Sequence, residues 1–372
     1  MRISRLIAKL ALLVNVLLIV ALLLSYFSVV ISPEKVGFLP LMGLLFPLLI
    51  LLNLLFVFFW LWRWKYFFLF STIALFIGFP IIHNVIQLPF GRSDIKNTPQ
   101  QEQMKVVSYN VRLFNLYDWA NNTDAAEQIL NLLQEESAGI ICLQEFYVNH
   151  NKKLNLSAIK HALGSTPNVH IAASDQGEST FYGIATFTKY PIVNRGEVHF
   201  ENTTNITIYT DIKVGSDTLR VFNNHLQSIR FKENNYSFIR NSKNYKEEER
   251  IREIKDISFR LIKASKKRAH QADVLAAYIS KSPHKVIVCG DFNDTPVSYT
   301  YKTIKGDLND AFHTYGKWLG TTYQGNFPSY RIDYILYDNQ LDLIDYRVKK
   351  SNLSDHYPII GIFKKPQSPN NS

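Results

Sequence analysis

Cysteine and methionine are scarce in this chain: its 372 residues include two cysteines and three methionines. Cys142 and Cys289 both fall inside apolar runs that predict buried strands, and neither spacing is typical of a metal site. If Glu145 and Asp291, which follow them, face one site, the two-residue period of a strand sends the two sulfur atoms to opposite faces of their strands. We therefore expect no disulfide, even outside the cytoplasm, and no cysteine-based metal centre.

Charge is scarce in the first 90 residues, although the mean hydropathy of the whole chain is close to zero. Three apolar runs in this part are each about 20 residues or longer, which is enough to cross a bilayer as a helix. They are residues 6–31, 36–62 and 66–88. The sequence therefore predicts a membrane region (1–90) with three transmembrane helices, a polar linker (91–103), a globular domain (104–366) and a disordered tail (367–372).

The basic residues beside these runs predict an orientation. Arg2, Arg5 and Lys9 precede or open the first run, and Arg63 and Lys65 lie between the second and the third. The loop between the first and second runs has one lysine, beside a glutamate. By the positive-inside rule the N-terminus is cytoplasmic, and the globular domain of this multi-pass protein is periplasmic or on the outer face.

Two alternatives stay open. The third run contains Gly78 and Pro80, which would kink a helix, and if it does not span, the domain lies in the cytoplasm. The first run could instead be a cleaved signal peptide, although it is long and has no Ala-x-Ala cleavage site; the domain would still lie outside.

The stretch KVIVCGDFNDTPVS, residues 285–298, is the most informative part of the globular domain. An apolar β-branched run predicts a buried strand, which breaks at Gly290 and delivers Asp291 and Asn293. Taken alone, this pattern also fits an ordinary Asx-type turn. Other predicted strands also carry polar residues at or near one end, however, and these are Asn110, Glu145, His225, Asp333, and Asp355 with His356.

Many strands, few long helices and no internal repeat of fixed period predict an α+β sandwich of two sheets with helices outside. Strand ends of one sandwich can converge on one cleft. Carboxylate and carboxamide oxygens suit Mg²⁺ or Mn²⁺ better than zinc. Such an ion, a carboxylate that activates water and a histidine near the phosphoryl group are suited to the hydrolysis of a phosphate ester.

The segments SYNV, LQE, NHL, GDFN, RIDY and SDHYP occur in this order between residues 104 and 364. With them the chain resembles the endonuclease/exonuclease/phosphatase superfamily, which includes deoxyribonuclease I, abasic-site endonucleases, sphingomyelinases and inositol polyphosphate 5-phosphatases. The resemblance implies a four-layered α/β sandwich, two mixed β-sheets flanked by helices. It also implies phosphoester cleavage that depends on a divalent metal.

Carried over to this sequence, the resemblance implies a metal side and a water side. Glu145 would be the principal metal ligand, with Asn110 beside it and Asp355 on the same side. Asp291 would position or deprotonate the attacking water. Asn293 would bind the phosphate and help to place that water.

The resemblance also implies roles for the remaining polar residues. His356 would contact the scissile phosphate, oriented by Asp333, and His225 would lie near the phosphate or the leaving group. Tyr182 lies where family members often place substrate-contacting groups. Simpler interpretations are a core histidine for His225, an ion-pair partner of Arg331 for Asp333, and packing for Tyr182.

Residues 229–268 are an apparent insertion before the GDFN strand, with 13 basic and six acidic residues. One interpretation is a solvated helix with pairs of opposite charge four residues apart. The other is a lid or arm that rests on anionic lipid headgroups or on a polyanionic substrate.

Three functions are compatible with these observations. The first is a membrane-anchored, metal-dependent hydrolase of the phosphodiesterase or endonuclease type. The second is the same chemistry on a lipid or sugar phosphate, as in a phospholipase C or a phosphatase. The third is an inactive membrane protein that uses the fold for binding. The expected partners are a phosphate-ester substrate (nucleic acid or phospholipid) and the lipid bilayer, and nothing in the sequence indicates a protein partner. The net charge of +10 fits all three.

Overall fold

The structure is a computed structural model that describes residues 2–88, 98–117, 124–149, 151, 154–164, 168–177, 179–325 and 328–366. The expected tail and most of the expected linker lie outside these residues. The chain forms two compact units, each built from several stretches. The first unit is Met1–Ile86, Ile229–His270 and Asp294–Thr303; the second is Gln87–Ser228, Gln271–Asn293 and Ile304–Ser372.

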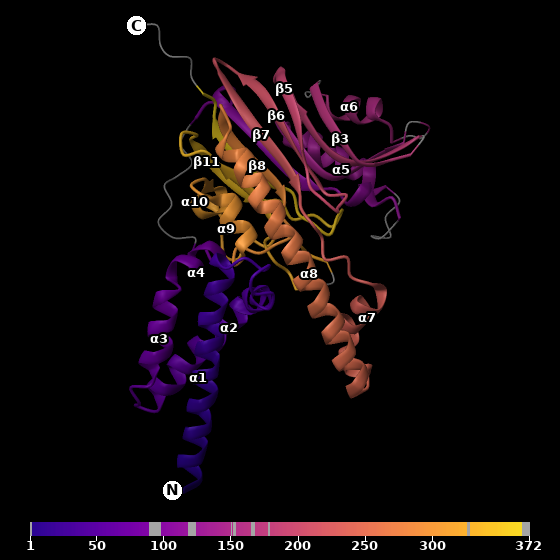
Figure 1. The fold of residues 1–372 in the computed structure, drawn as a ribbon. Helices are drawn as coiled ribbons and strands as arrows, with labels where there is room; N and C mark the ends of the chain where they lie inside the picture. The colour runs from indigo at the N-terminus through magenta and orange to yellow at the C-terminus, as the bar shows by residue number, and fades with distance from the viewer. Residues whose placement is uncertain are drawn as a thin grey trace, which may run out of the picture. The chain divides into compact units, whose positions relative to one another are not determined.

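The second unit contains two six-stranded mixed sheets (Figure 1). In spatial order, the first sheet is β11 (Leu343–Val348), β12 (Ile359–Lys364), β1 (Gln103–Asn110), β2 (Ile140–Asn149), β4 (Thr180–Thr188) and β3 (Asn168–Gln176). The second sheet is β5 (Ile192–His199), β6 (Ile206–Val214), β7 (Asp217–His225), β8 (Lys285–Asp291), β10 (Asp333–Tyr337) and β9 (Asn309–Asp310). Each sheet has one parallel pair, β1 with β2 and β7 with β8, and its other neighbours are antiparallel.

Apolar side chains bury both faces of these sheets. One cluster, which includes Val106, Ile140, Val221 and Ile287, fills the space between the two sheets. A second cluster packs α5 (Ala125–Glu136) and α6 (Leu156–Leu163) against the outer face of the first sheet. On the second sheet, Tyr278 from the end of α8 (Glu247–Ser280) contacts Tyr209 of β6. Two sheets flanked by helices confirm the four-layered α/β sandwich that the sequence predicts.

The first unit contains α1 (Arg2–Val30) and α2 (Leu39–Trp62), two helices long and apolar enough to cross a membrane. The third apolar run is broken into α3 (Phe68–Ile77) and α4 (Phe79–Val85), which meet at a bend of 68° at Gly78, where the sequence predicts a kink. The pair passes the test for a membrane segment only when taken together. Two single helices are thus suited to crossing a membrane, and the bent pair is suited to a third crossing only if it forms one segment.

A chain of buried polar side chains joins the apolar helices. Asn15 Nδ2 donates to Ser71 Oγ at 2.7 Å, and Ser71 Oγ donates to Asn53 Oδ1 at 3.0 Å. Trp60 Nε1 donates to Asn15 Oδ1 at 2.9 Å. The two asparagines in the apolar runs therefore act as interhelical hydrogen-bond partners, as polar residues commonly do in membrane bundles.

The remaining helices are short, apart from α8. They are α7 (Glu233–Asn241), α9 (Tyr299–Lys305), α10 (Ala311–Tyr315) and three single 3₁₀ turns, Gln100–Glu102, Arg112–Asn115 and Ser242–Asn244. The expected helix in the basic insertion is present as α8, which begins in the first unit and continues into the second.

Two local expectations are wrong for one reason. The sequence predicts that the LQE strand ends on Glu145, but β2 continues to Asn149 through a β-bulge at this residue. The extra residue of a bulge reverses the alternation of side chains beyond it. Cys142 therefore faces the space between the sheets and lies beside Cys289, not on an opposite face. Both cysteines are free, and burial, with Cys142 nearby, raises the pKa of the Cys289 thiol.

Candidate functional site

The polar strand ends meet at one edge of the second unit. Asn110 ends β1, His225 ends β7 and Asp291 ends β8, while Asp333 begins β10. Glu145 projects from the bulge in β2. The loops before β12 and after β8 supply the other three members, Asp355, His356 and Asn293. Parallel strands present their carboxyl ends at the same sheet edge, which explains why β7 and β8 place His225 opposite Asp291.

Asp291 is the centre of this cluster. Its side chain is 1 % exposed, and its Oδ2 atom accepts hydrogen bonds of 3.0 Å from the amides of both Asn110 and Asn293. The same oxygen lies 3.7 Å from His356 Nε2 and 3.9 Å from His225 Nε2. Oδ1 accepts the backbone N–H of Asn293 at 2.8 Å. A buried carboxylate is thus surrounded by nitrogen donors.

The turn that carries Asp291 and Asn293 has a demanding backbone. Gly290 has φ +135°, and a Cβ there would lie 2.1 Å from the carbonyl oxygen of Asn224 in the neighbouring strand. Asn293 has φ +53°, a left-handed conformation that asparagine tolerates better than most residues. Its amide also donates to the carbonyl of Leu226 at 3.1 Å. This hydrogen bond joins the turn to the residue that directly follows β7. The turn therefore requires glycine at its first position.

Glu145 lies at the open side of the cluster, with 31 % of its side chain exposed. The bulge gives it φ +46°, which is uncommon for a glutamate and is typical of strain kept at functional sites. Its Oε1 atom accepts a hydrogen bond of 3.2 Å from Asn110 Nδ2 and lies 3.6 Å from His225 Nε2. The Asn110 amide therefore bridges the carboxylates of Glu145 and Asp291.

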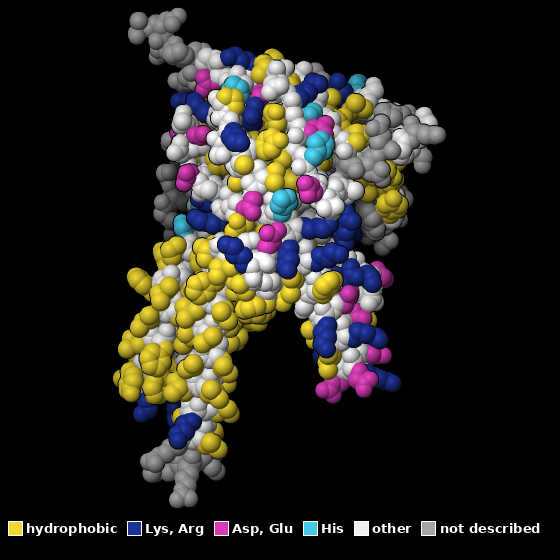
Figure 2. Space-filling view, viewed as in Figure 1, with side chains coloured by type: hydrophobic (Ala, Val, Ile, Leu, Met, Phe, Trp, Pro, Cys, Tyr) yellow, Lys and Arg dark blue, Asp and Glu magenta, His cyan; other side chains and the backbone are white. Residues whose placement is uncertain are grey.

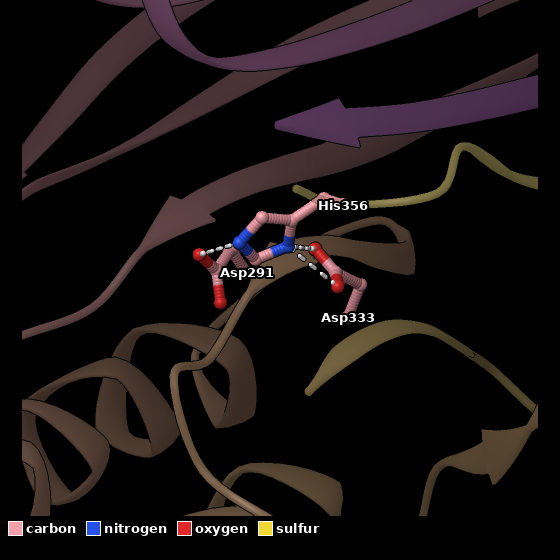
Figure 3. A group of neighbouring side chains, drawn as sticks. All are labelled: Asp291, Asp333 and His356. Carbon is pink, nitrogen blue, oxygen red and sulfur yellow. Dashed lines mark hydrogen bonds and ion pairs between the residues drawn. The ribbon is translucent and has the colours of Figure 1, made fainter. Parts of the chain in front are cut away.

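His356 and Asp333 form the pair drawn with Asp291 in Figure 3. His356 Nδ1 lies 2.9 and 3.1 Å from the two carboxylate oxygens of Asp333, and Nε2 points toward Asp291. The Thr322 hydroxyl accepts the backbone N–H of Asp333 at 3.1 Å, and the Tyr323 ring packs edge-on against the imidazole. The imidazole is thus fixed between two carboxylates.

The simpler interpretation of Asp333 is wrong, because Arg331 pairs with Asp310 at 2.8 Å and not with Asp333. Asp355 lies beside another cation: Arg112 Nε is 3.4 Å from its Oδ2. Arg112 has φ +45° and its backbone N–H donates to Asn110 Oδ1. This arginine is not among the residues predicted from the sequence, although its place two residues after Asn110 in the SYNVR segment could have pointed to it.

These contacts shift the pKa values of three groups. Burial, and then the charge of Asp333, raise the pKa of Asp291 to about 6, although both histidines act in the opposite direction. Burial and the nearby Asp355 raise the pKa of Glu145. Burial alone would lower the pKa of His356, but Asp333 and Asp291 outweigh it and raise that pKa well above its usual value. At neutral pH the site therefore holds an imidazolium among carboxylates.

The donor set fits a divalent cation. Asp291, Asp333 and His356 each offer a ligand atom, all within 4.8 Å of one another. Asp333 and His356 already bind each other, so the more open oxygen donors are those of Glu145, beside Asn110 and Asp291. Oxygen ligands suit Mg²⁺ or Mn²⁺, and carboxylates whose pKa values are raised by burial and by like charge gain most from a cation.

The structure places the Tyr182 ring against an apolar cluster of the first sheet. Its ring centroid is 5.1 Å from that of Tyr147, and both belong to the apolar cluster beneath α5 and α6. Tyr182 thus takes part in the packing of this cluster, and its contact with a substrate stays a prediction.

Comparisons with known proteins agree with this architecture. A family model described as "Endonuclease/Exonuclease/phosphatase family" matches residues 107–356, and one described as "Domain of unknown function (DUF8431)" matches residues 8–85. No curated protein matches the chain.

Among solved structures, an endonuclease/exonuclease/phosphatase from Bacteroides vulgatus is similar with a TM-score of 0.52 and 16 % identity, covering 71 % of this chain and 99 % of that one. A family protein from Bacteroides thetaiotaomicron has a TM-score of 0.51 and 18 % identity, covering 70 % and 97 %. One from Beutenbergia cavernae has a TM-score of 0.51 and 13 % identity, covering 72 % and 73 %. At these identities the likeness shows the fold.

Proposed function

This chain belongs to the endonuclease/exonuclease/phosphatase family, whose members are phosphoester hydrolases, and from this premise we propose that it is a membrane-anchored phosphoesterase that depends on a divalent metal. One observation carries the proposal. A buried carboxylate, Asp291, is held within 3.0 to 3.9 Å of two amides and two imidazoles, beside a second carboxylate at the opening. Such a constellation is costly to maintain without a function, because buried charges need many partners.

Asp291 would accept the proton of the attacking water. A general base works best when its pKa is close to the working pH, and a pKa of about 6 leaves Asp291 ionised at neutral pH. Asn293, whose amide donates to the same carboxylate, would fix the position of that water and bind a phosphate oxygen. These assignments rest on the hydrogen bonds of the turn.

Glu145 would be the principal ligand of the divalent ion, with Asn110 and Asp355 beside it. Mg²⁺ or Mn²⁺, when bound, would neutralise charge on the phosphate and on the leaving oxygen. The family generally uses divalent metals, and the oxygen-rich donors of this site agree with that.

His356 would donate from Nε2 to a phosphate oxygen as negative charge gathers there. Asp333 would hold the imidazole in the protonated state and fix its orientation through Nδ1. His225, which reaches both Glu145 and Asp291, would contact the phosphate or the leaving group. This chain's own residues would thus provide a general base, ligands for the metal ion and a donor to the charged phosphate oxygen.

The first unit would anchor the protein. Along α1, Asn15 contacts Ser71 and Tyr26 donates to the carbonyl of Ala74, so residue numbers rise in the same direction in α1 and α3. The α3 segment would therefore cross in the same direction as α1 and leave on the side where α1 ends. With the basic residues at the start of α1 and between α2 and α3 in the cytoplasm, the chain after α4 would be extracytoplasmic.

The test is hydrolysis by the full chain reconstituted in nanodiscs, with Mg²⁺, with Mn²⁺ and with excess chelator. Plasmid DNA, a phospholipid panel, a sugar phosphate and a small chromogenic diester would be assayed in parallel. The key variants are Asp291→Asn and His356→Asn. The matched controls are Asp307→Asn and His199→Asn, which replace exposed residues of the same types in the second unit.

Metal-dependent turnover that both site variants lose and both controls keep would support the proposal. Nicking of DNA would identify a nuclease, and release of a lipid headgroup or of phosphate would identify the lipid or sugar phosphate hydrolase. A folded protein that hydrolyses nothing, or one whose activity survives Asp291→Asn, would contradict the proposed chemistry and leave the binding-only function.

A further inference from the structure

Part of α8 exposes large apolar side chains in the middle of a strongly charged segment. We call α7 and the first-unit part of α8 up to Lys267 the arm. Within the arm, Ile251 is 48 % exposed, Ile254 53 % and Phe259 64 %. With 3.6 residues per turn, these three lie on one half of the helix surface. Scattered apolar residues on a surface are ordinary, but three together on one side of a charged helix indicate a partner.

Basic side chains lie on the same half of the helix. Arg252, Lys255, Lys263 and Lys266 are exposed and make no ion pair with any residue that the structure describes. We call these four residues and the three apolar ones the exposed face of α8. It therefore combines apolar surface with uncompensated positive charge.

Two acidic residues in the middle of this stretch, Glu253 and Asp256, contact polar side chains of the arm instead. Glu253 is 5 % exposed and accepts hydrogen bonds of 3.0 Å from the amides of Asn234 and Asn235 on α7. Asp256 pairs with Arg260 at 2.8 Å and also binds Asn235. The α7 helix thus binds these two acidic side chains, so they do not compensate the basic side chains of the exposed face.

The exposed face adjoins the loop between α1 and α2. A Cβ on Gly37 in this loop would lie 3.2 Å from Ile262 Cγ2 and 3.5 Å from Lys266 Cε. Ile262 lies on the same half of α8 as Ile251, one to three turns away from the other apolar residues. Since α1 and α2 both end at this loop, the exposed face begins where the apolar helices end, at the expected boundary of the bilayer. Figure 2 shows the hydrophobic surface of these helices and, on the arm, basic and hydrophobic side chains together with acidic ones toward its tip.

We propose that the exposed face of α8 docks on the anionic headgroup layer of the bilayer that holds α1 and α2. The inference rests on the membrane anchoring proposed above. Apolar residues enter the headgroup boundary while lysines and arginines pair with lipid phosphates, as in interfacial helices. Three consecutive glutamates, Glu247 to Glu249, begin the helix ahead of the exposed face, and their charge would keep this end out of the hydrocarbon. A nucleic acid would use the positive charge but would leave the isoleucines in water, which favours the lipid.

The experiment uses the full chain with a single introduced cysteine at Phe259→Cys or Ile254→Cys, labelled with an environment-sensitive dye. Both native cysteines are 0 % exposed, so labelling would be selective. The protein is placed in nanodiscs of phosphatidylcholine alone or of phosphatidylcholine with phosphatidylglycerol. Asp307→Cys, at an exposed position outside the arm, is the control. We expect a blue shift and quenching by headgroup-labelled lipid at both arm positions in anionic discs, with no change at the control.

Removing a positive charge from the exposed face of α8 should weaken its docking on anionic lipid. Each lysine near an anionic surface contributes about fivefold to binding, so Lys255→Gln and Lys263→Gln should each lower the docking equilibrium about fivefold. Emission that is the same in both lipids, or that ignores these lysines, would overturn the proposal. A shift caused by added DNA in neutral discs, without one in anionic discs, would also overturn it and assign the face to nucleic acid.

Failure of the arm and failure of the proposed function are distinguishable. A protein that cannot be reconstituted would refute the anchoring and the docking together. A protein that reconstitutes but hydrolyses no phosphoester would refute the enzymatic function, while the dye response still decides the docking. Asp291→Asn is expected to leave that response unchanged.

Discussion

The substitution Asp333→Asn separates the charge of the His356–Asp333 pair from its hydrogen bond. Asparagine keeps an acceptor for His356 Nδ1, which lies 2.9 Å from the carboxylate, and removes only the negative charge. Burial, the largest influence on His356, lowers its pKa and would then be opposed chiefly by Asp291. Two unit charges whose centres lie about 4 Å apart in an effective dielectric of about 20 interact by about 4 kcal/mol, so the loss of the Asp333 charge should clearly lower the pKa of His356.

In the Asp333→Asn variant, both limbs of the pH–rate profile should move in the same direction. In the proposed mechanism activity requires an ionised Asp291 and a protonated His356, so the acidic limb would report the first and the basic limb the second. Without the charge of Asp333 the pKa of His356 falls, and the pKa of Asp291, which that charge raises, falls too. The whole profile therefore moves to lower pH. Above neutral pH the variant should lose about 10²- to 10³-fold in kcat/KM, as when one oxyanion donor is removed.

The assay is kcat/KM on the best phosphodiester substrate from about pH 5 to about pH 9, at saturating metal. Asp307→Asn, an exposed control, should keep the wild-type profile. Thermal unfolding would show that the variant is folded. A variant that loses activity equally at all pH values, with its basic limb in place, would refute the idea that Asp333 acts by holding His356 protonated.

Three further predictions concern stability. Gly290→Ala should lower the free energy of unfolding by about 3 kcal/mol or more, because its Cβ would lie 2.1 Å from a backbone oxygen; an unchanged Tm would contradict this. Glu136→Gln should cost about 1 to 2 kcal/mol at neutral pH: burial opposes ionisation of Glu136, but Lys349 and Arg347 outweigh it and lower the pKa. That contribution is present above pH 4.5, the ordinary value, and is lost as pH falls through the lowered pKa, so urea unfolding of the two proteins should converge in acid. Ser71→Ala should loosen the apolar helices by about 1 kcal/mol in detergent, measured by thermal unfolding, whereas Thr72→Ala on the exposed side should not.

The fold and most of the cluster could be predicted from the sequence because apolar runs end on polar residues there. Asn110, His225 and Asp291 each lie in such a motif, and each is the last residue of its strand in the structure. Glu145 is different. Its left-handed backbone is a tertiary effect, imposed by the pairing of β2 with β4, and no glycine marks it in the sequence. The bulge explains both errors at this strand: β2 continues beyond Glu145, and Cys142 faces the opposite side from the one predicted.

Three strands were not predicted because their sequences lack a clear alternation of apolar and polar residues. Strands β3, β5 and β11 lie at or next to the sheet edges, where one side of a strand needs less apolar surface and alternation is weak. Arg112 escaped because its pairing with Asp355 joins residues far apart in the sequence. Local sequence preferences do not predict contacts between residues far apart in the sequence. The family resemblance alone indicated which distant residues would meet.

The basic segment 229–268 contacts the stretch that follows the GDFN turn. From Asp294 onward this stretch belongs to the first unit. There the Asp294 carboxylate accepts hydrogen bonds from Arg268 at 3.0 Å and from Thr300 at 2.8 Å, and all three side chains are buried. The Val297 carbonyl accepts the hydroxyl of Ser28, near the end of α1, at 3.0 Å. Side chains of α8 and of the apolar helix α1 thus contact the same short stretch, which follows Asn293 directly in the chain. The segment between the NHL and GDFN motifs thus supplies Arg268, a buried partner for the first residue of this stretch.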